Sequence, residues 1–347
     1  MTCPAIEAHG LGFTHIGSSS NPLFEELNLS IPRGSIYGLL GPNGCGKTTL
    51  MNMLHGRLKA SPGRLEALGL DPWQRPLEVR SRVALVPQNN DLDPKLTIDQ
   101  TLRLFYLAYK ERWRFEEAEA RLRRFGLDDR RQDLVESLSG GLAQRLNLVL
   151  ALAASPEILL LDEPTAGLDP VVRRDFSESV VDFMAEDPER TVVISSHLLS
   201  EIEPLIDHVG MFHVQGSRSV LLVDASLEDL KEKILVVRFD DPSAIVDTEA
   251  LGRFLSPIKI EEGEVSPLPK AFADLPGLLT ISRDASATSV FWAASADEAR
   301  IIGQKVTDMG GRVSESHSLD DIFVGLFQES MPVPGRRVLG GILHESR

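Results

Sequence analysis

Apolar residues recur in two alternating patterns over the first 225 residues of the chain. Short apolar runs bounded by glycine or proline predict buried strands, and longer stretches with apolar residues three or four positions apart predict helices. The clearest strands are expected at residues 35–40, 83–88, 158–164 and 191–197. Helices are expected directly after residue 47 and at residues 98–131, 146–154 and 169–186. Apolar strands that alternate with helices predict an α/β fold with a parallel sheet covered on both faces.

The character of the sequence changes near residue 226, just after an expected β-hairpin around Gly216. The segments expected beyond it are a short helix at 226–234, a strand at 235–239, loops at 240–274, two strands at 278–294 and a helix at 295–311. Proline and glycine are frequent after residue 331, which predicts a flexible tail. The predicted organisation is a first domain at residues 1–227, a small α/β domain at 228–330 and a tail at 331–347.

Composition narrows the class of protein. The chain has 347 residues, of which 42% are hydrophobic and 25% are charged, as in ordinary globular proteins. Its 36 Lys and Arg against 51 Asp and Glu give a net charge of −15, which argues against nucleic acid or anionic lipid as a direct partner. Two cysteines are too few for a disulfide framework or a cysteine-built zinc site. With no signal peptide and no apolar run long enough to span a bilayer, we expect a soluble intracellular protein.

Residues 41–48 match the pattern G-x-x-x-x-G-K-[ST] between a predicted strand and a predicted helix. In such a loop the glycines let successive backbone N–H groups face one concavity, and the following helix adds its positive N-terminal end. Lys47 adds a mobile positive charge for phosphate, and the Thr48 hydroxyl can ligate Mg²⁺. A glycine-rich turn could match by chance, but the strand and helix on either side favour a nucleotide-phosphate site.

Further motifs follow this loop in a fixed order. They are Gln88 in LVPQ, residues 138–145 (LSGGLAQR), 158–164 (ILLLDEP), 166–169 (AGLD) and His197 in ISSH. Taken alone, polar side chains at the end of a strand indicate no function, and this applies to Gln88, to His197 and to the Asp162-Glu163 pair. In this order, over roughly residues 5–225, the sequence resembles the ATP-binding cassette (ABC) family. The five motifs correspond to its Q-loop, signature, Walker B, D-loop and switch histidine.

The resemblance implies a P-loop NTPase fold with a mainly parallel core sheet, an antiparallel β subdomain and a helical signature subdomain. It also implies that ATP and Mg²⁺ are the cofactors and that the chain hydrolyses ATP. The implied ATP-binding residues are Gly41, Pro42, Asn43, Gly44, Cys45, Gly46, Lys47, Thr48, Thr49, Gln88, Ser139, Gly140 and Gly141. The implied Mg²⁺ ligands are Thr48, Gln88 and Asp162. The implied catalytic residues are Glu163, which polarises the attacking water, His197 and Lys47, with Asp169 in the D-loop.

Three positions depart from the usual family pattern or need a separate interpretation. The aromatic residue that usually stacks on adenine is replaced in that register by His15, with Phe13 two residues earlier, so either side chain can contact the base. Leu142 stands where many members have Gln, but the phosphate-facing Ser-Gly-Gly before it is intact. Cys45 is either a small filler of the loop, which we favour, or a thiolate stabilised by the cationic loop.

Other features narrow the branch of the family. Three features disfavour the translation-factor, DNA-repair and chromosome-maintenance branches: a single cassette, the lack of zinc-binding cysteines and a separation of 92 positions from Lys47 to Ser139. The stretches GLDPVVRRDF, SSHLLSEIEPLIDHV and SLDDIFVGLF look like those of bacterial exporter ATPase subunits. In that class, residues 228–330 would be an accessory domain for dimerisation or regulation. Aromatic side chains that could form the permease groove, or simply pack in the core, are Tyr109, Trp113 and Phe115.

The resemblance therefore implies an assembly at a membrane. Two ATPase subunits, identical or different, would meet head to tail and power a separate transmembrane permease. The chain would lie on the cytoplasmic face of the membrane as a peripheral protein and would bind no nucleic acid. A soluble non-transport cassette ATPase with a regulatory or mechanical role, and the ATPase of an importer, stay open as alternatives.

Overall fold

The computed structural model describes most of the first 228 residues and several short strands beyond them. The described residues are 3–14, 22–109, 112–165, 168–197, 202–215, 218–228, 234–239, 280–283, 288–293 and 312–314. The chain divides into two compact units, Met1–Asp224 and Ala225–Arg347.

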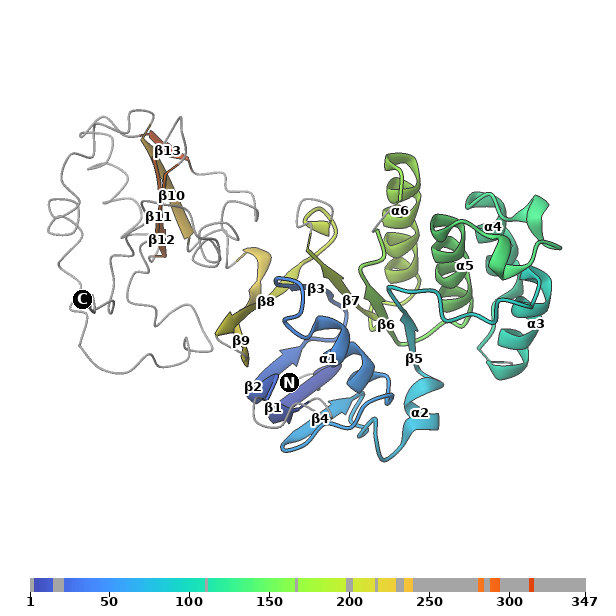
Figure 1. Ribbon diagram of the computed structural model, residues 1–347, viewed down its shortest axis with the longest axis horizontal. Helices are drawn as coiled ribbons and strands as arrows, with labels where there is room; N and C mark the ends of the chain where they lie inside the picture. Colours follow the sequence, from blue (N-terminus) through green and yellow to red (C-terminus); the bar gives the residue numbers. More distant parts are fainter. Residues whose placement is uncertain are drawn as a thin grey trace, which may run out of the picture. The chain divides into compact units, whose positions relative to one another are not determined.

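A nine-stranded sheet is the framework of the first unit (Figure 1). In spatial order its strands are β4 (Arg64–Ala67), β1 (Ile6–Phe13), β2 (Phe24–Ile31), β9 (Arg218–Ser226), β8 (His208–Gln215), β3 (Ile36–Leu40), β7 (Thr191–Ser196), β6 (Ile158–Asp162) and β5 (Val83–Val86). The pairs from β8 through β3, β7 and β6 to β5 are parallel, whereas β1 pairs antiparallel with both β2 and β4. The predicted parallel core with an antiparallel β part is therefore confirmed.

The centre of this sheet is fully enclosed. Every residue of β3, β6 and β7 is buried, which is the pattern of parallel strands that are covered on both faces. Helix α1 (Lys47–Leu54) packs against β4 and β6 and contributes Leu50, Met51, Met53 and Leu54 to the hydrophobic core. The start of α1 is thereby fixed at the carboxyl end of β3, where the predicted phosphate loop lies.

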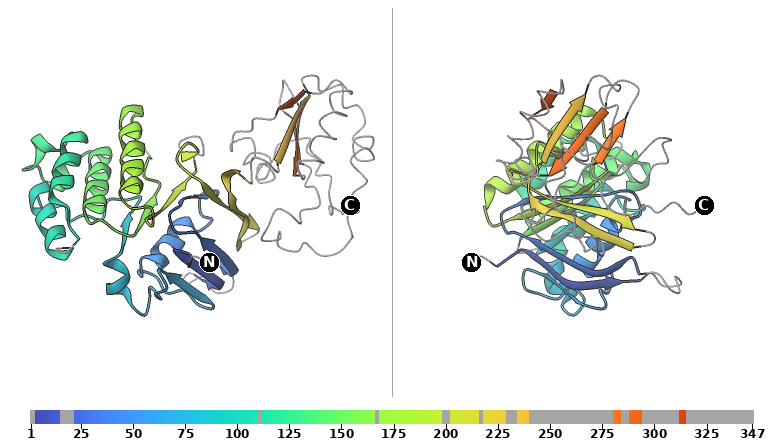
Figure 2. Two further views of the ribbon diagram at one scale, coloured as in Figure 1. Left: turned by 180° about the vertical axis from the view of Figure 1, so that it is seen from behind. Right: turned by 90° about the vertical axis from the view of Figure 1, so that its left-hand side faces the viewer.

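Helices beyond β6 and β5 form a separate layer. The helices α4 (Phe115–Arg124), α5 (Gly140–Ala153) and α6 (Pro170–Glu186) lie side by side in two views, with α3 (Ile98–Ala108) packed on α5 and the short α2 (Pro76–Arg80) near β5 (Figures 1 and 2). The helical stretch expected at residues 98–131 is thus divided into α3, α4 and a 3₁₀ turn at Asp128–Arg130. None of the helices in the described part of the chain is long and apolar enough to cross a membrane.

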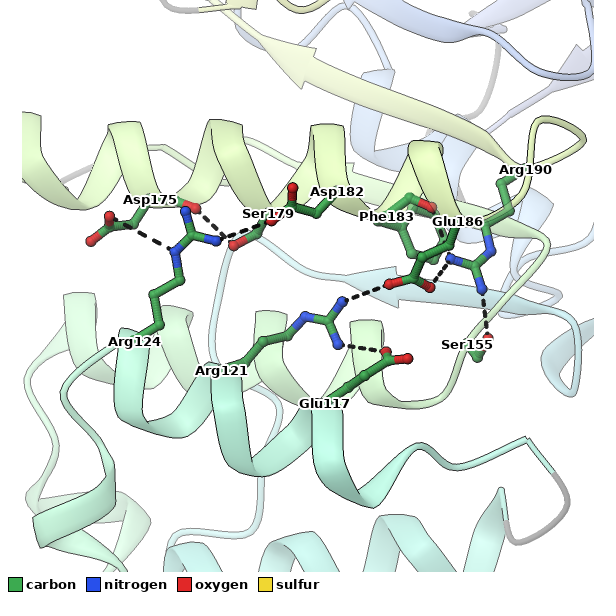
Figure 3. A network of polar contacts seen from close by, with 10 residues as sticks. All are labelled: Glu117, Arg121, Arg124, Ser155, Asp175, Ser179, Asp182, Phe183, Glu186 and Arg190. Carbon is green, nitrogen blue, oxygen red and sulfur yellow. Dashed lines mark hydrogen bonds and ion pairs between the residues drawn. The ribbon is translucent and has the colours of Figure 1, made fainter.

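Ion pairs connect α4 to α6 (Figure 3). Arg124 lies 3.9 Å from Asp175 and 3.2 Å from Asp182, measured between guanidinium nitrogens and carboxylate oxygens. Arg121 of the same helix reaches Glu186 at 3.5 Å. The charged pattern of this stretch, which alone is typical of a solvated helical face, therefore also serves to hold two helices together.

The second unit contains a four-stranded antiparallel sheet. Its strands, in spatial order, are β11 (Thr280–Arg283), β12 (Thr288–Ala293), β10 (Ile234–Phe239) and β13 (Arg312–Ser314). The two strands expected at 278–294 correspond to β11 and β12. The loops expected at 240–274, the helix at 295–311 and the tail at 331–347 lie outside the described residues. The domain limits at 227 and 330 and the accessory role stay predictions.

Candidate functional site

The loop between β3 and α1 has the backbone of a phosphate-binding loop. Gly41 and Gly46 have φ values of 154° and 98°, in the region that favours glycine. Both positions are also too crowded for a side chain, because a Cβ on Gly41 would lie 2.9 Å from the Phe212 carbonyl oxygen and one on Gly46 would lie 2.5 Å from Phe24 Cζ. Gly46 is the N-cap of α1, so the positive end of this helix points at the loop.

Lys47 is folded back across the loop. Its Nζ donates hydrogen bonds to the carbonyl oxygens of Gly41 at 2.8 Å and Pro42 at 3.3 Å, and the residue is only 5% exposed. The exposed residues of the loop are Asn43, Gly44 and Thr48, while Thr49 is half-buried. The ammonium is therefore enclosed by the loop and held by two neutral backbone carbonyls.

The Cys45 side chain faces the core instead of the open side of the loop. It is completely buried in the main hydrophobic cluster, with Sγ 4.0 Å from Lys47 Nζ. Burial raises the pKa of the Cys45 thiol, and the positive charge of Lys47 offsets only part of this effect. The hypothesis of a stabilised thiolate is therefore wrong, and the filler interpretation fits the structure.

Three of the predicted motifs meet at the carboxylate of Glu163. Its Oε2 accepts a hydrogen bond from Gln88 Nε2 at 3.1 Å and lies 3.2 Å from His197 Nδ1. These residues follow the carboxyl ends of β5, β6 and β7, which are neighbouring parallel strands. The side chain of Glu163 is 11% exposed and that of His197 is 41% exposed, so the cluster is enclosed on the Glu163 side and open on the other.

Asp162 ends β6 and is 2% exposed. Its Oδ1 accepts a hydrogen bond from Ser195 Oγ at 2.7 Å, and the same Oγ accepts one from the Glu163 N–H at 2.9 Å. Sequence reasoning missed Ser195. A serine in ISSH becomes informative only once the register is known, and in the sheet Ser195 lies directly opposite Asp162.

The signature residues lie at the N-terminus of α5. Ser139 is the N-cap of this helix, and its Oγ accepts a hydrogen bond from the Leu142 N–H at 3.4 Å. Ser139 and Gly140 are exposed and Gly141 is half-buried. The first turn of a 14-residue helix therefore opens to solvent with its N–H groups and its positive dipole end.

Asp169 of the predicted D-loop is the N-cap of α6. Its Oδ1 accepts hydrogen bonds from the N–H groups of Val171 and Val172, each at 3.1 Å. The Asp169 side chain is 56% exposed, which leaves it accessible from outside the chain. Ala166 and Gly167, the first half of this motif, lie outside the described residues.

The structure describes only one of the two candidates for the adenine contact. Phe13 is half-buried at the end of β1 and packs against the main hydrophobic cluster. His15 lies outside the described residues. The choice between them stays a prediction.

The aromatic candidates for a permease groove fall into two groups. Trp113 is 8% exposed and belongs to the core, and Tyr109 is half-buried. Phe115, at the start of α4, is 54% exposed, and two leucines of α3 are exposed as well, Leu104 at 53% and Leu107 at 71%. The exposed surface of α3 and α4 therefore includes aliphatic and phenyl groups beside charged residues such as Arg103 and Glu116.

Comparison with known proteins agrees with this geometry. The family model described as "ABC transporter" matches residues 24–166. The bacitracin transport ATP-binding protein BcrA of Bacillus licheniformis is 35% identical over 211 residues, which is 60% of this chain and 66% of the relative. The daunorubicin resistance ATP-binding protein DrrA3 of Streptomyces coeruleorubidus is 37% identical over 210 residues, 59% of this chain and 64% of the relative. The chain thus spans slightly less than two thirds of these two proteins.

A third relative is covered almost completely. The Nod factor export ATP-binding protein I of Burkholderia orbicola is 32% identical over 280 residues, 76% of this chain and 89% of the relative. Among solved structures, an ATP binding subunit of an ABC transporter aligns with a TM-score of 0.57 at 24% identity, covering 65% of this chain and 92% of that chain. The structural likeness establishes the fold.

The fold and the order of the motifs are those of an ATP-binding cassette domain. The chain belongs to the ABC transporter family and carries its ATP-binding domain, which in this family hydrolyses ATP.

Proposed function

We propose that this chain is the ATP-binding and ATP-hydrolysing subunit of an ABC exporter and powers a separate transmembrane permease. The observation that carries the proposal is the meeting of Gln88 and His197 at the Oε2 atom of Glu163, at the carboxyl ends of the parallel strands. The direction of transport follows from the relatives, whose names record bacitracin transport, Nod factor export and daunorubicin resistance.

The proposed ATP site is the concavity of the loop between β3 and α1. Backbone N–H groups of residues 41–48 and the N-terminal end of α1 supply positive charge to the phosphates. The Nζ of Lys47, which binds the carbonyls of Gly41 and Pro42 in the structure, exchanges them for β- and γ-phosphate oxygens. Phe13 or His15 contacts the adenine. An acidic chain can therefore bind a polyanion through one small loop.

Mg²⁺ is the proposed metal cofactor, and the available donors fit it. The Thr48 hydroxyl, the Gln88 amide oxygen and the Asp162 carboxylate are hard oxygen ligands of the kind that Mg²⁺ prefers. Ser195 occupies one lone pair of Asp162 Oδ1, so the remaining lone pairs of this carboxylate are free for a metal or its water ligands. When bound, Mg²⁺ neutralises charge on the β- and γ-phosphates.

Glu163 is the proposed general base. Its carboxylate orients a water molecule that attacks the γ-phosphorus, and it accepts the proton that this water loses. The bond between the γ-phosphorus and the bridging oxygen breaks, which leaves ADP and inorganic phosphate. His197, beside Glu163, donates a hydrogen bond to the γ-phosphate. Gln88 reports the state of the site to the permease through its loop.

The proposed assembly is a head-to-tail pair of ATPase subunits on the cytoplasmic face of the membrane. The open N-terminus of α5, with Ser139, Gly140 and Gly141, is a second anion site that would contact ATP bound by the opposite subunit. The exposed apolar side chains of α3 and α4 would meet the permease. Residues 228–330 would serve dimerisation or regulation.

Copurification tests this function. The tagged chain is expressed together with a permease encoded beside its gene and is isolated from detergent-solubilised membranes. We expect a detergent-dependent complex with a polytopic membrane protein and ATPase activity in that complex. A ribosome or DNA partner would instead support a non-transport ATPase, and dependence on a periplasmic binding protein would support an importer.

A further inference from the structure

Ser195 connects the two acidic residues at the end of β6. Its Oγ donates to Asp162 Oδ1 at 2.7 Å and accepts from the Glu163 N–H at 2.9 Å. Ser195 has no exposed surface and Asp162 is 2% exposed, so water does not compete for these bonds. A single hydroxyl thus links the carboxylate of Asp162, a proposed Mg²⁺ ligand, to the backbone N–H of Glu163, the proposed base.

The backbone of Glu163 needs such a restraint. Its φ is 47°, in the left-handed region that residues with a Cβ rarely adopt. Strained residues of this kind persist only where the surrounding structure fixes them, and they are concentrated at active sites. The Glu163 N–H also approaches the Ser195 carbonyl oxygen at 3.2 Å, but the hydroxyl is the closer acceptor and the one that a substitution can remove.

We propose that Ser195 is a positioning residue for ATP hydrolysis that holds the Glu163 turn and thereby aims its carboxylate. The proposal rests on the proposed role of Glu163 as general base. Ser195 acts only through Glu163 and Asp162 and contacts neither nucleotide nor attacking water. Without the hydroxyl, the Glu163 backbone relaxes toward ordinary φ values and its carboxylate leaves Gln88 and His197. The loss falls on kcat, because the phosphate loop on β3 and α1 is unchanged.

The test compares four variants of the full chain, each with a single substitution. Ser195→Ala and Ser195→Cys remove the strong hydroxyl donor, and Ser195→Thr keeps it. Thr191→Val is the matched control, because Thr191 lies at the other end of β7, has no exposed surface and accepts a hydrogen bond from the Gly34 N–H at 3.3 Å. For each variant, kcat and KM for ATP, the affinity for a fluorescent ATP analogue and the thermal unfolding midpoint are measured.

We expect Ser195→Ala and Ser195→Cys to lower kcat by about tenfold or more, with KM and analogue affinity within about twofold of wild type. Ser195→Thr should restore most of kcat. Thr191→Val should keep the wild-type kcat even where its unfolding midpoint falls as much as that of Ser195→Ala. A wild-type kcat in Ser195→Ala, equal rates in the Ala and Thr variants, or a loss of analogue binding that matches the loss of kcat would each overturn the proposal.

A Glu163→Gln variant in the same assay distinguishes a failure of the Ser195 role from a failure of the Glu163 role. If Glu163→Gln is inactive while Ser195→Ala hydrolyses ATP normally, only the role of Ser195 fails. If Glu163→Gln itself turns over at the wild-type rate, the proposed base fails, and the positioning role fails with it.

Discussion

The guanidinium of Arg145 in α5 lies 3.3 Å from the carboxylate of Asp169 at the start of α6. Arg145 also donates to the carbonyl oxygen of Phe125, directly after α4, at 3.2 Å. Asp169 uses Oδ1 for the N-cap of α6 and Oδ2 for Arg145. One pair of side chains therefore links α5, which begins at the predicted signature residues, to the predicted D-loop. The N-cap and the ion pair of Asp169 can be separated by substitution.

Asp169→Ala should lower the free energy of unfolding by about 1 kcal/mol, as the loss of an N-cap acceptor usually does. Asp169→Asn should cost less, because Asn is an equally good N-cap and gives up only an exposed ion pair worth less than about 1 kcal/mol. Urea unfolding of the two variants measures the difference. An equal loss of unfolding free energy in both variants would mean that Asp169 stabilises the fold through its ion pair with Arg145 and not through the N-cap.

Arg190 is the most enclosed cation of the network in Figure 3, with a side chain that is 9% exposed. Its guanidinium donates to the Phe183 carbonyl oxygen and to Ser155 Oγ, each at 2.8 Å, and lies 4.3 Å from the centroid of the Phe183 ring. Arg190→Met should lower the free energy of unfolding by about 2 kcal/mol, because buried acceptors lose a charged donor. Denaturant unfolding at fixed salt measures this loss.

Arg174→Met is the control for that measurement. The Arg174 side chain is 75% exposed and pairs with Glu178 at 3.5 Å. Exposed pairs of this kind contribute little, so the change should stay below about 0.5 kcal/mol. Similar losses in the Arg190 and Arg174 variants would show that the enclosed network stabilises the fold no more than an ordinary surface pair.

The local parts of the site were readable from the sequence, and the parts that depend on register were not. The phosphate loop and the acidic pair after residues 158–161 are contiguous patterns, so both could be predicted with the strands on which they lie. Ser195 needed the pairing of β6 with β7, and the link made by Arg145 needed the packing of α5 against α6. The burial that raises the pKa of Cys45 likewise depends on the core around the loop.

Short elements were missed for a related reason. Strand β4 has four residues and is held by its antiparallel pairing with β1, far away in sequence. Helix α2 has five residues and buries only Val79. Neither is long enough to show a hydrophobic period of its own, because a helical or alternating pattern needs more residues than these elements contain.

His55 should make stability depend on pH. Burial lowers its pKa to about 3, assisted by the positive charges of Arg57 and Arg80. The folded chain therefore keeps His55 neutral while the unfolded chain protonates it below its ordinary pKa of 6.5. Because the unfolded state binds the extra proton, stability falls as pH drops below 6.5, by up to about 1.4 kcal/mol per pH unit. Urea unfolding at pH 7 and pH 5.5 should show this loss in wild type and a smaller one in His55→Leu; equal losses would assign it to other groups.

Lys47→Ala should abolish most of the nucleotide affinity. The ammonium lies 2.8 Å from the Gly41 carbonyl oxygen within the loop, where the β- and γ-phosphates are proposed to bind. Titration with a fluorescent ATP analogue should show affinity reduced by about tenfold or more, as the loss of a charged hydrogen bond implies. Unaltered binding would refute the phosphate role of Lys47. A normal unfolding midpoint in the same preparation excludes misfolding as the cause.

Glu163→Gln should separate ATP binding from ATP hydrolysis. A glutamine is close in shape and can still accept hydrogen bonds from Gln88 and His197, but it cannot take up the proton of the attacking water. The turnover number should therefore fall by about 100-fold or more while ATP affinity is kept. ATP that is bound but not hydrolysed should also hold two chains together, so size-exclusion chromatography with ATP should show a dimer that wild type forms only transiently. Glu178→Gln, a surface carboxylate on α6 with 52% exposure, should behave as wild type in both assays. Hydrolysis by Glu163→Gln at the wild-type rate would contradict the assignment of Glu163 as the base.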